Sequence, residues 1–373
     1  MKKIPMVDLY GQYFKIKEEI DSAVLDCMSS TNYINGPQVE KFSIEFKNYL
    51  NAKYVIPCAN GTDALQIALM SLDLKPGDEI ICPAFTYVAT AEVIALLGLT
   101  PVMCDVDSQT FNVTKENIEP LITKKTKVIV PVHLFGQSCQ MKEIVELAKS
   151  YNLYIIEDNA QSVGADCFLN DSKIKTGTIG DIGTVSFFPS KNLGCFGDGG
   201  AIITNNEILA KKIKMIANHG QLKKYYHQVV GCNSRLDSIQ ASILSVKLKY
   251  LDDYILSRNK MAKIYDNELC DINEIKLPYR SKFSSHVFHQ YTIQVNSRRD
   301  ELQSFLLSNN IPAMIYYPVP LYRQKAYTQY VKSDFCIKNV DDLCNKVLSL
   351  PIHTEIENSH QDYIIDKIKY FFN

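Results

Sequence analysis

Short apolar runs that alternate with helical segments are the feature that most constrains this chain. The runs cover 54–56, 79–83, 101–105, 127–132 and 153–158, and helical segments separate most of them. Near-continuous apolar runs between helices are typical of a parallel sheet that helices cover on both faces. The sequence therefore predicts an α/β fold with a mostly parallel central sheet. In such sheets, ligands bind just outside the carboxyl ends of the strands.

The pattern changes after about residue 245. A long charged helix is predicted over 236–269, followed by an alternating strand over 290–295 and helices over 300–308 and 359–371. This order is typical of a smaller α+β domain. The sequence therefore predicts three parts: an N-terminal helical segment (1–30) with a helix over 12–29, a large domain (31–245) and a small C-terminal domain (246–373).

Charge and cysteine content exclude several classes of protein. The 373 residues carry a net charge of −1, which gives no basic field for nucleic acid and no polybasic membrane patch. No run is long and apolar enough to predict a membrane span, and the start lacks the apolar core of a secretory signal. The eleven cysteines are scattered and the seven histidines lack metal-ligand spacing. We therefore expect a cytoplasmic protein without a bound metal.

One lysine stands just beyond a predicted buried strand. The apolar run 184–188 ends at Pro189, and Lys191 lies in the glycine-rich loop that follows. Desolvation disfavours the charged form of a lysine, and a neutral amine can attack a carbonyl to form a Schiff base. A solvated loop lysine fits the same position, so the interpretation depends on the residues around it.

Asp158 ends another apolar run and has two interpretations. As a single residue it fits a helix N-cap. Together with Lys191 it fits pyridoxal 5′-phosphate (PLP), which needs a lysine for its aldehyde and a carboxylate for its pyridine nitrogen. Gly61 and Thr62 at a helix start, with the Ser186 hydroxyl, would form a phosphate cradle. A capped helix start without a ligand is the alternative for that segment.

Six segments together resemble the sugar aminotransferase family of PLP enzymes, and the resemblance runs nearly end to end. It implies the PLP-dependent aspartate-aminotransferase fold (fold type I) and an enzyme that adds amino groups to nucleotide-linked keto sugars. The segments are 60–65 (Asn-Gly-Thr-Asp-Ala-Leu), 85–90 (Phe-Thr-Tyr-Val-Ala-Thr), 157–162 (Glu-Asp-Asn-Ala-Gln-Ser), 186–200, 231–237 (Gly-Cys-Asn-Ser-Arg-Leu-Asp) and 317–321 (Tyr-Pro-Val-Pro-Leu).

The resemblance implies catalytic and ring-binding roles for four residues. Lys191 matches the Schiff-base lysine, which also moves the proton between the two imine forms. The cofactor forms implied are PLP and pyridoxamine phosphate (PMP). Asp158 matches the partner of the pyridine nitrogen. Tyr87 falls where the family stacks an aromatic side chain on the cofactor ring. Gln161 matches a residue near the ring hydroxyl.

The resemblance also implies that the site is shared between two subunits. Gly61, Thr62 and Ser186 match phosphate binders of the same chain. Asn233 matches an asparagine that the neighbouring subunit delivers to the phosphate, which implies a homodimer. His219 precedes the loop that reaches toward the partner subunit in the family.

The substrate implied is the 3-keto group of a UDP-2-acetamido-2-deoxy-hexuronate, with glutamate as amino donor, in surface-polysaccharide or lipopolysaccharide O-antigen biosynthesis. A sugar carboxylate is matched by a guanidinium, and Arg235 is the candidate. A structural or diphosphate-facing arginine fits Arg235 equally. Tyr316 stands where the family members acting on this uronate have histidine, and another UDP- or dTDP-keto-hexose (3- or 4-keto) is the alternative. Tyr316 and Tyr317 fit either nucleotide binding or packing of the small domain.

Three rival functions are weighed against this interpretation. Dehydratases of the same family carry histidine in place of Lys191, so the lysine argues against them. A nicotinamide dehydrogenase is disfavoured because the glycines of 197–200 lack the strand-then-helix context of a dinucleotide fingerprint. A non-catalytic protein that binds PLP or a nucleotide sugar is the alternative from another class.

Overall fold

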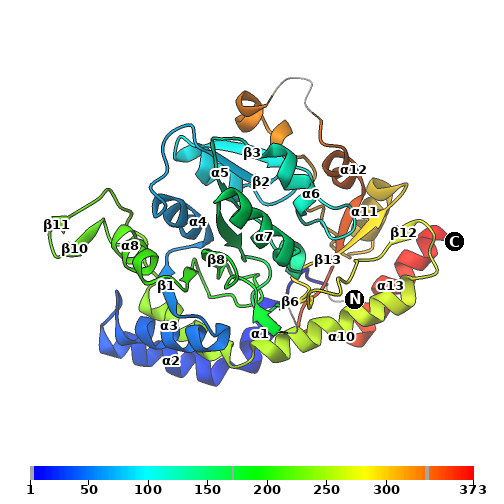
Figure 1. The fold of residues 1–373 in the computed structure, drawn as a ribbon. Helices are drawn as coiled ribbons and strands as arrows, with labels where there is room; N and C mark the ends of the chain where they lie inside the picture. The colour runs from blue at the N-terminus through cyan, green and yellow to red at the C-terminus, as the bar shows by residue number, and fades with distance from the viewer. Residues whose placement is uncertain (1–3, 170–171, 332–335) are drawn as a thin grey trace.

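A seven-stranded sheet forms the centre of the computed structural model, which describes residues 4–169, 172–331 and 336–373 (Figure 1). Strand β9 pairs antiparallel with both β1 and β8, and all other neighbouring pairs are parallel. The predicted mostly parallel sheet is therefore confirmed. In spatial order the strands are β1 (Tyr54–Cys58), β9 (Gly200–Thr204), β8 (Ile182–Ser186), β5 (Tyr154–Asp158), β4 (Thr126–Ile129), β2 (Glu79–Pro83) and β3 (Thr100–Cys104).

Helices cover both faces of this sheet, and the alternation along β9 shows how. Ile202 belongs to the core that includes α4, whereas Ala201 and Ile203 belong to the core that includes α3 and α9. Successive side chains of a strand point to opposite faces, so one strand supplies both cores. The helices of this part are α3 (Pro37–Leu50), α4 (Gly61–Met70), α5 (Ala89–Leu96), α6 (Lys115–Ile118), α7 (Met141–Tyr151), α8 (Glu207–Ala217) and α9 (Ser238–Leu248).

A separate hydrophobic core is built largely from the C-terminal part of the chain around a three-stranded antiparallel sheet, β12-β13-β14. It includes the wholly buried Tyr265 and Tyr291 and takes in Ile4 from the start of the chain. The predicted domain limits at 30 and 245 stay predictions. The elements are α10 (Leu251–Leu269), β12 (Ile275–Lys276), β13 (Tyr291–Val295), α11 (Arg299–Ser308), α12 (Lys338–Lys346), β14 (Val347–Leu350) and α13 (Asn358–Phe372).

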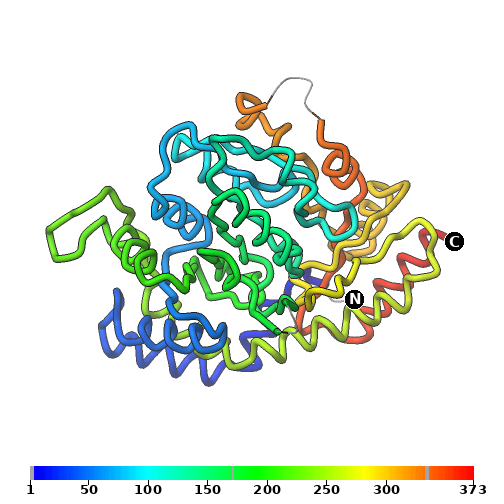
Figure 2. Tube along the Cα trace, viewed as in Figure 1, coloured from blue at the N-terminus to red at the C-terminus, as the bar shows by residue number. Residues whose placement is uncertain are grey.

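The predicted continuous helix over 236–269 is wrong. It is divided into α9 and α10, which meet at Lys249 and Tyr250. The two halves have different neighbours, since α9 packs on α2 and α3 whereas α10 packs on α13 (Figure 2). The sequence pattern predicts one continuous helix, but packing against two different sets of helices divides it.

The N-terminal helices lie against α9. Two helices, α1 (Leu9–Lys15) and α2 (Lys17–Ser30), replace the single helix predicted over 12–29. Ile16 leaves helical geometry between them and packs with Ile20 on Ile243 and Val246. Within the described ranges, no helix combines the length and apolar character needed to cross a bilayer.

Two small hairpins complete the chain. One consists of β6 (Asp166–Leu169) and β7 (Ser172–Lys175). The other, β10 (Gln221–Lys223) and β11 (Tyr226–His227), projects away from the body after α8 (Figure 1). This second hairpin exposes Leu222, Tyr225 and Tyr226, and Val230 just beyond it is exposed as well.

Candidate active site

The site residues predicted at the strand ends are brought together by two neighbouring parallel strands. Asp158 is the last residue of β5, and it pairs in register with Thr184 of β8. Strand β8 ends at Ser186, and the chain continues from there to Lys191. Because β5 and β8 are parallel, their carboxyl ends meet at one edge of the sheet. Lys191 and Asp158 are therefore electrostatic neighbours, and each influences the pKa of the other.

Asp158 is a buried carboxylate whose main chain and side chain are both held. Its backbone N–H donates to Pro131 at 2.9 Å, and its carbonyl accepts from the backbone of His133 at 3.0 Å. Its Oδ1 accepts from the backbone N–H of Ala160 at 3.1 Å, and its Oδ2 accepts from Thr90 Oγ1 at 2.9 Å. Asp158 is followed directly by a turn and then by strand β6 rather than by a helix, so the N-cap interpretation is wrong.

Burial sets the electrostatics of this pair. Desolvation raises the pKa of the Asp158 carboxyl, and the hydrogen bonds from Ala160 and Thr90 and the charge of Lys191 oppose that rise. Desolvation lowers the pKa of Lys191 to about 8, and Asp158 opposes this. Lys191 is half-buried rather than solvated. Near neutral pH, a fraction of its amine is therefore uncharged and nucleophilic.

The start of α4 is the candidate phosphate cradle. Asn60 caps this helix by accepting the N–H of Asp63 at 2.8 Å, and the free N–H groups of the first turn remain available. Gly61 packs so tightly that a Cβ would lie 2.6 Å from Cβ of Ser186. Glycine therefore lets the helix start approach the end of β8. The half-buried Thr62 and Ser186 hydroxyls lie on this cradle, whose donors suit the PLP phosphate.

Aromatic side chains lie on another side of the site. Tyr87, which is 57% exposed, has its ring centroid 6.4 Å from that of Tyr317. The half-buried Tyr316 ring lies 6.0 Å from Tyr317. Tyr317 also packs at 6.0 Å against Phe85. The aromatic loop of 314–322 thus contacts the segment that follows β2. Tyr87 and Tyr316 both lie beside Tyr317 on this side of the site.

Gln161 makes two hydrogen bonds within the chain that the sequence analysis did not predict. Its Oε1 accepts from the backbone N–H of Phe135 at 2.9 Å, and its Nε2 donates to the hydroxyl of Tyr317 at 3.1 Å. One amide hydrogen remains for a ligand. Gln161 thus links the large sheet to the aromatic loop, and the role toward the cofactor hydroxyl stays a prediction.

Three predicted residues lie apart from this cluster in the same chain. Asn233 and His219 are exposed at the base of the β10–β11 hairpin, and the His219 carbonyl accepts from His227 Nδ1 at 2.8 Å. Arg235 lines a groove of about 810 Å³ between α3 and α8. No hydrogen bond or ion pair between described residues joins the three to Lys191 or Asp158.

The segment of Asn233 nevertheless borders the phosphate cradle. The buried Ser234 hydroxyl accepts from the backbone N–H of Ala59 at 3.0 Å, two residues before Gly61. Asn233 and Arg235 flank this serine, and of the two Asn233 is exposed and Arg235 is half-buried.

Two buried residues of the site carried no role in the sequence interpretation. Thr90 binds the Asp158 carboxylate, and Glu157 accepts backbone N–H groups of 177–180 at 2.6–2.9 Å. The only sequence signal was that Thr90 and Glu157 stand inside matched segments. Nothing in the spacing shows that a threonine of α5 reaches the end of β5.

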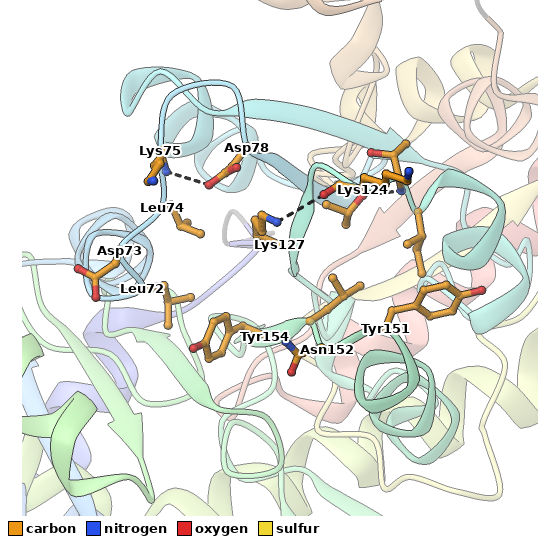
Figure 3. Close-up of a pocket in the computed structure, with 14 residues that line it drawn as sticks. Leu72, Asp73, Leu74, Lys75, Asp78, Lys124, Lys127, Tyr151, Asn152 and Tyr154 are labelled. Atoms are coloured by element: carbon orange, nitrogen blue, oxygen red, sulfur yellow. Dashed lines mark hydrogen bonds between the residues drawn. The ribbon is translucent and has the colours of Figure 1, made fainter.

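A second pocket lies at the opposite ends of the strands (Figure 3). It has a volume of about 780 Å³ and is lined by residues where β4 and β5 begin, including Lys127 and Tyr154. Asp158 ends β5, so this pocket is separate from the site above.

This sheet, with a half-buried lysine beside a buried carboxylate and a candidate phosphate cradle at its strand ends, is that of a fold type I PLP enzyme. The chain belongs to the DegT/DnrJ/EryC1/StrS aminotransferase family, whose sequence model matches residues 14–369. It is a PLP-dependent transaminase, with PLP/PMP as its cofactor.

Similar proteins cover nearly the whole chain. A Geobacillus stearothermophilus protein named pleiotropic regulatory protein is 42% identical over 99% of this chain and 98% of its own. The UDP-2-acetamido-2-deoxy-3-oxo-D-glucuronate aminotransferase of Pseudomonas aeruginosa is 41% identical over 95% and 97%. The UDP-N-acetyl-3-dehydro-alpha-D-glucosamine 3-aminotransferase of Acidithiobacillus ferrooxidans is 39% identical over 95% and 94%.

Solved structures agree with this assignment. DesV of S. venezuelae, solved with a ketimine intermediate, superposes with a TM-score of 0.96 at 34% identity, covering 100% of this chain and 99% of DesV. NtdA of Bacillus subtilis, solved with PMP, has a TM-score of 0.93 at 32% identity, covering 100% of this chain and 86% of NtdA.

Proposed function

We propose that this enzyme transfers the amino group of glutamate to the 3-keto group of a UDP-2-acetamido-2-deoxy-hexuronate. The observation that carries the chemistry is the half-buried Lys191 beside the buried Asp158. The 41% identity to the P. aeruginosa enzyme supports the uronate. We further infer a cytoplasmic role in surface-polysaccharide biosynthesis, such as that of lipopolysaccharide O-antigen. The free thiols of all eleven cysteines support a reducing compartment.

Each residue at the strand ends has an assigned task. When bound, PLP supplies an aldehyde and a ring that accepts electrons from the reacting carbon. Lys191 would hold the aldehyde, and its freed amine would be the group that accepts and returns the proton of the reacting carbon. Asp158 holds the ring nitrogen protonated. Tyr87 covers the ring, and Gly61, Thr62 and Ser186 bind the phosphate; Gln161 orients the ring hydroxyl.

Asp158→Asn tests the central assignment. The amide keeps the shape but cannot hold the ring nitrogen protonated, so we expect kcat to fall at least about 100-fold. We also expect PMP to bind more weakly to the purified protein. Unchanged PMP affinity and unchanged kcat would contradict the role of Asp158.

We propose a homodimer in which Asn233, Arg235 and His219 act in the partner's site. All three lie apart from Lys191 in their own chain, and the hairpin beside them exposes apolar side chains. A second apolar groove of about 720 Å³, lined by α1, α2 and α9 residues such as Leu25 and Ile239, supports burial against a second copy.

Subunit mixing tests the shared site directly. Lys191→Ala and Asn233→Ala subunits are co-expressed with different tags, and the mixed dimer is isolated. If Asn233 acts across the dimer, one of the two sites is intact, and activity returns to about half that of the wild-type dimer. If Asn233 acts within its own chain, both sites stay defective and mixing restores nothing.

Arg235 is assigned to the sugar carboxylate, and Tyr316 to the nucleotide sugar beside it. A guanidinium binds a carboxylate through two parallel hydrogen bonds that lysine cannot reproduce. Arg235→Lys should therefore lower kcat/KM roughly 10- to 100-fold for UDP-2-acetamido-2-deoxy-3-keto-glucuronate and little for its neutral glucose counterpart. An equal loss for both sugars would place Arg235 at the diphosphate instead.

A neutral UDP-3-keto sugar is the second candidate substrate. The A. ferrooxidans relative that bears such a name is 39% identical, nearly as similar as the uronate enzyme. Tyr316, in place of the family histidine, supports this alternative. Assays with UDP- and dTDP-keto sugars and glutamate decide between the two, since turnover of neutral sugars alone would overturn the uronate.

A further inference from the structure

The Asp158 carboxylate is held by a side chain from a distant part of the chain. Thr90, in the first turn of α5, donates its hydroxyl to Oδ2 of Asp158 at 2.9 Å, although the residues are 68 positions apart. Thr90 is 1% exposed and Asp158 is 6% exposed. A hydrogen bond between buried groups, one of them ionised, is stronger than an exposed one.

Among the described residues, Thr90 is the hydrogen-bond donor to Oδ2 of Asp158, and the other hydrogen bonds of Asp158 involve its backbone and Oδ1. The Asp158 backbone is fixed between Pro131 and His133, and Oδ1 accepts from Ala160. These contacts come from residues that are adjacent in the sheet or in sequence. Among the residues that the structure describes, Thr90 alone donates a side-chain hydrogen bond to this carboxylate, and its β-branched side chain has few rotamers to choose from.

We propose that Thr90 is the positioning residue of Asp158: its hydroxyl fixes the carboxylate rotamer and keeps it ionised for the cofactor ring nitrogen. This proposal rests on the assigned role of Asp158. The direction of the electrostatic effect agrees with it, because burial raises the pKa of Asp158 and Thr90 opposes that rise. Without the hydroxyl, a larger fraction of Asp158 would be protonated at a given pH.

Thr90→Val and Thr90→Ser separate the hydroxyl from the packing of the side chain. Valine keeps the shape and loses the hydroxyl, whereas serine keeps the hydroxyl and loses the methyl group. We expect Thr90→Val to weaken PMP binding to the purified protein about tenfold or more, and Thr90→Ser to bind like wild type. The opposite order, with valine unimpaired and serine impaired, would overturn the proposal.

A pH profile gives a signature that lost packing alone would not produce. With its donor removed, Asp158 protonates at higher pH, so the acid limb of kcat should move upward by about one pH unit in Thr90→Val. The KM for the sugar should change little. An acid limb that coincides with wild type would contradict the assignment.

Two controls keep the test decisive. Thr204→Val removes another buried hydroxyl, which donates to the Asp181 carbonyl at 2.7 Å at the far end of the sheet, and should leave PMP binding unchanged. If Thr90→Val does not fold, a comparison of Thr90→Ala with Thr90→Ser isolates the same oxygen atom, and equal PMP affinities of these two variants would refute the proposal. If Asp158→Asn binds PMP as tightly as wild type, the assigned role of Asp158 is wrong. If Asp158→Asn binds PMP weakly but Thr90→Val binds it normally, only the role of Thr90 is wrong.

Discussion

His133 donates a hydrogen bond through Nε2 to Oε2 of Glu157 at 2.8 Å, and both side chains are fully buried. The backbone N–H of Cys139 donates to His133 Nδ1 at 3.1 Å, which leaves the ring proton at Nε2. Glu157 also accepts from backbone N–H groups of 177–180. This network ties β5, which ends at Asp158, to the segment that leads into β8, the strand that precedes Lys191.

Glu157→Gln should destabilise the protein. An amide places its own N–H groups against donors that the carboxylate satisfies, so we expect a loss of about 3 kcal/mol in the free energy of unfolding. Urea unfolding of the cofactor-free protein measures it. Glu301→Gln, which removes an exposed carboxylate, is the control and should change stability by less than about 0.5 kcal/mol. Equal stability of the two variants would contradict the structural role of Glu157.

Gly61→Ala should separate α4 from the end of β8. The new Cβ would lie 2.6 Å from Ser186 Cβ, and such overpacking costs about 1–3 kcal/mol. We expect weaker PMP binding together with a lower unfolding temperature. In Gly61→Ala/Ser186→Gly the opposing Cβ is absent, so the stability should recover while PMP affinity stays low. Full recovery of PMP affinity would show that Ser186 does not bind the phosphate.

Lys191→Met should stabilise the cofactor-free protein below pH 8. Burial lowers the pKa of Lys191 to about 8 from its ordinary 10.5, so at lower pH the folded state holds a charge that it disfavours. The gain should be roughly 3 kcal/mol at most and should shrink between pH 8 and 10.5, where the folded lysine is already neutral.

Lys247 also affects stability in this pH range, because burial lowers its pKa to about 8 as well. Lys247 is present in both Lys191→Met and wild type, so its effect cancels when the two are compared. The difference between Lys191→Met and wild type, measured by urea unfolding at pH 7 and pH 10, isolates Lys191. Lys41→Met removes an exposed lysine and should show no such pH-dependent gain. A pH-independent gain in Lys191→Met would mean that apolar packing, not charge, is responsible.

Tyr317→Phe and Tyr316→Phe should affect different properties. The Tyr317 hydroxyl accepts from Gln161 Nε2, so its loss leaves a buried amide hydrogen unpaired and costs about 1–2 kcal/mol of stability. Tyr316→Phe should leave the unfolding temperature unchanged but raise the KM for the nucleotide sugar. Thermal unfolding and steady-state kinetics on both variants check the contrast, and a stability loss in Tyr316→Phe would contradict it.

The sequence predicts the strands that carry the site because their signals are local. The apolar run 79–83 is strand β2, and the run that ends at Asp158 is β5. The pairing of Lys191 with Asp158 follows from parallel strands ending at one edge. The reversed direction of β9 depends on its partners β1 and β8, and no local pattern encodes it.

The remaining site contacts depend on residues that are far apart in sequence. Thr90 reaches Asp158 across 68 positions, and Tyr317 reaches Gln161 across 156. Only the packed fold brings such side chains together. The break between α9 and α10 has the same origin, because it follows from what each helix packs against.

The loop that carries Lys191 leaves and re-enters the sheet at one point, because Ser186 pairs directly with Gly200. A Cβ on Gly200 would lie 2.4 Å from the carbonyl oxygen of Asn60. The point where the loop rejoins the sheet therefore also packs closely against Asn60, the N-cap of α4. The entropy of ordering residues 187–199 is therefore lost when the protein folds, not when the cofactor arrives. The amine is preorganised beside its carboxylate, and cofactor capture needs little rearrangement of the main chain.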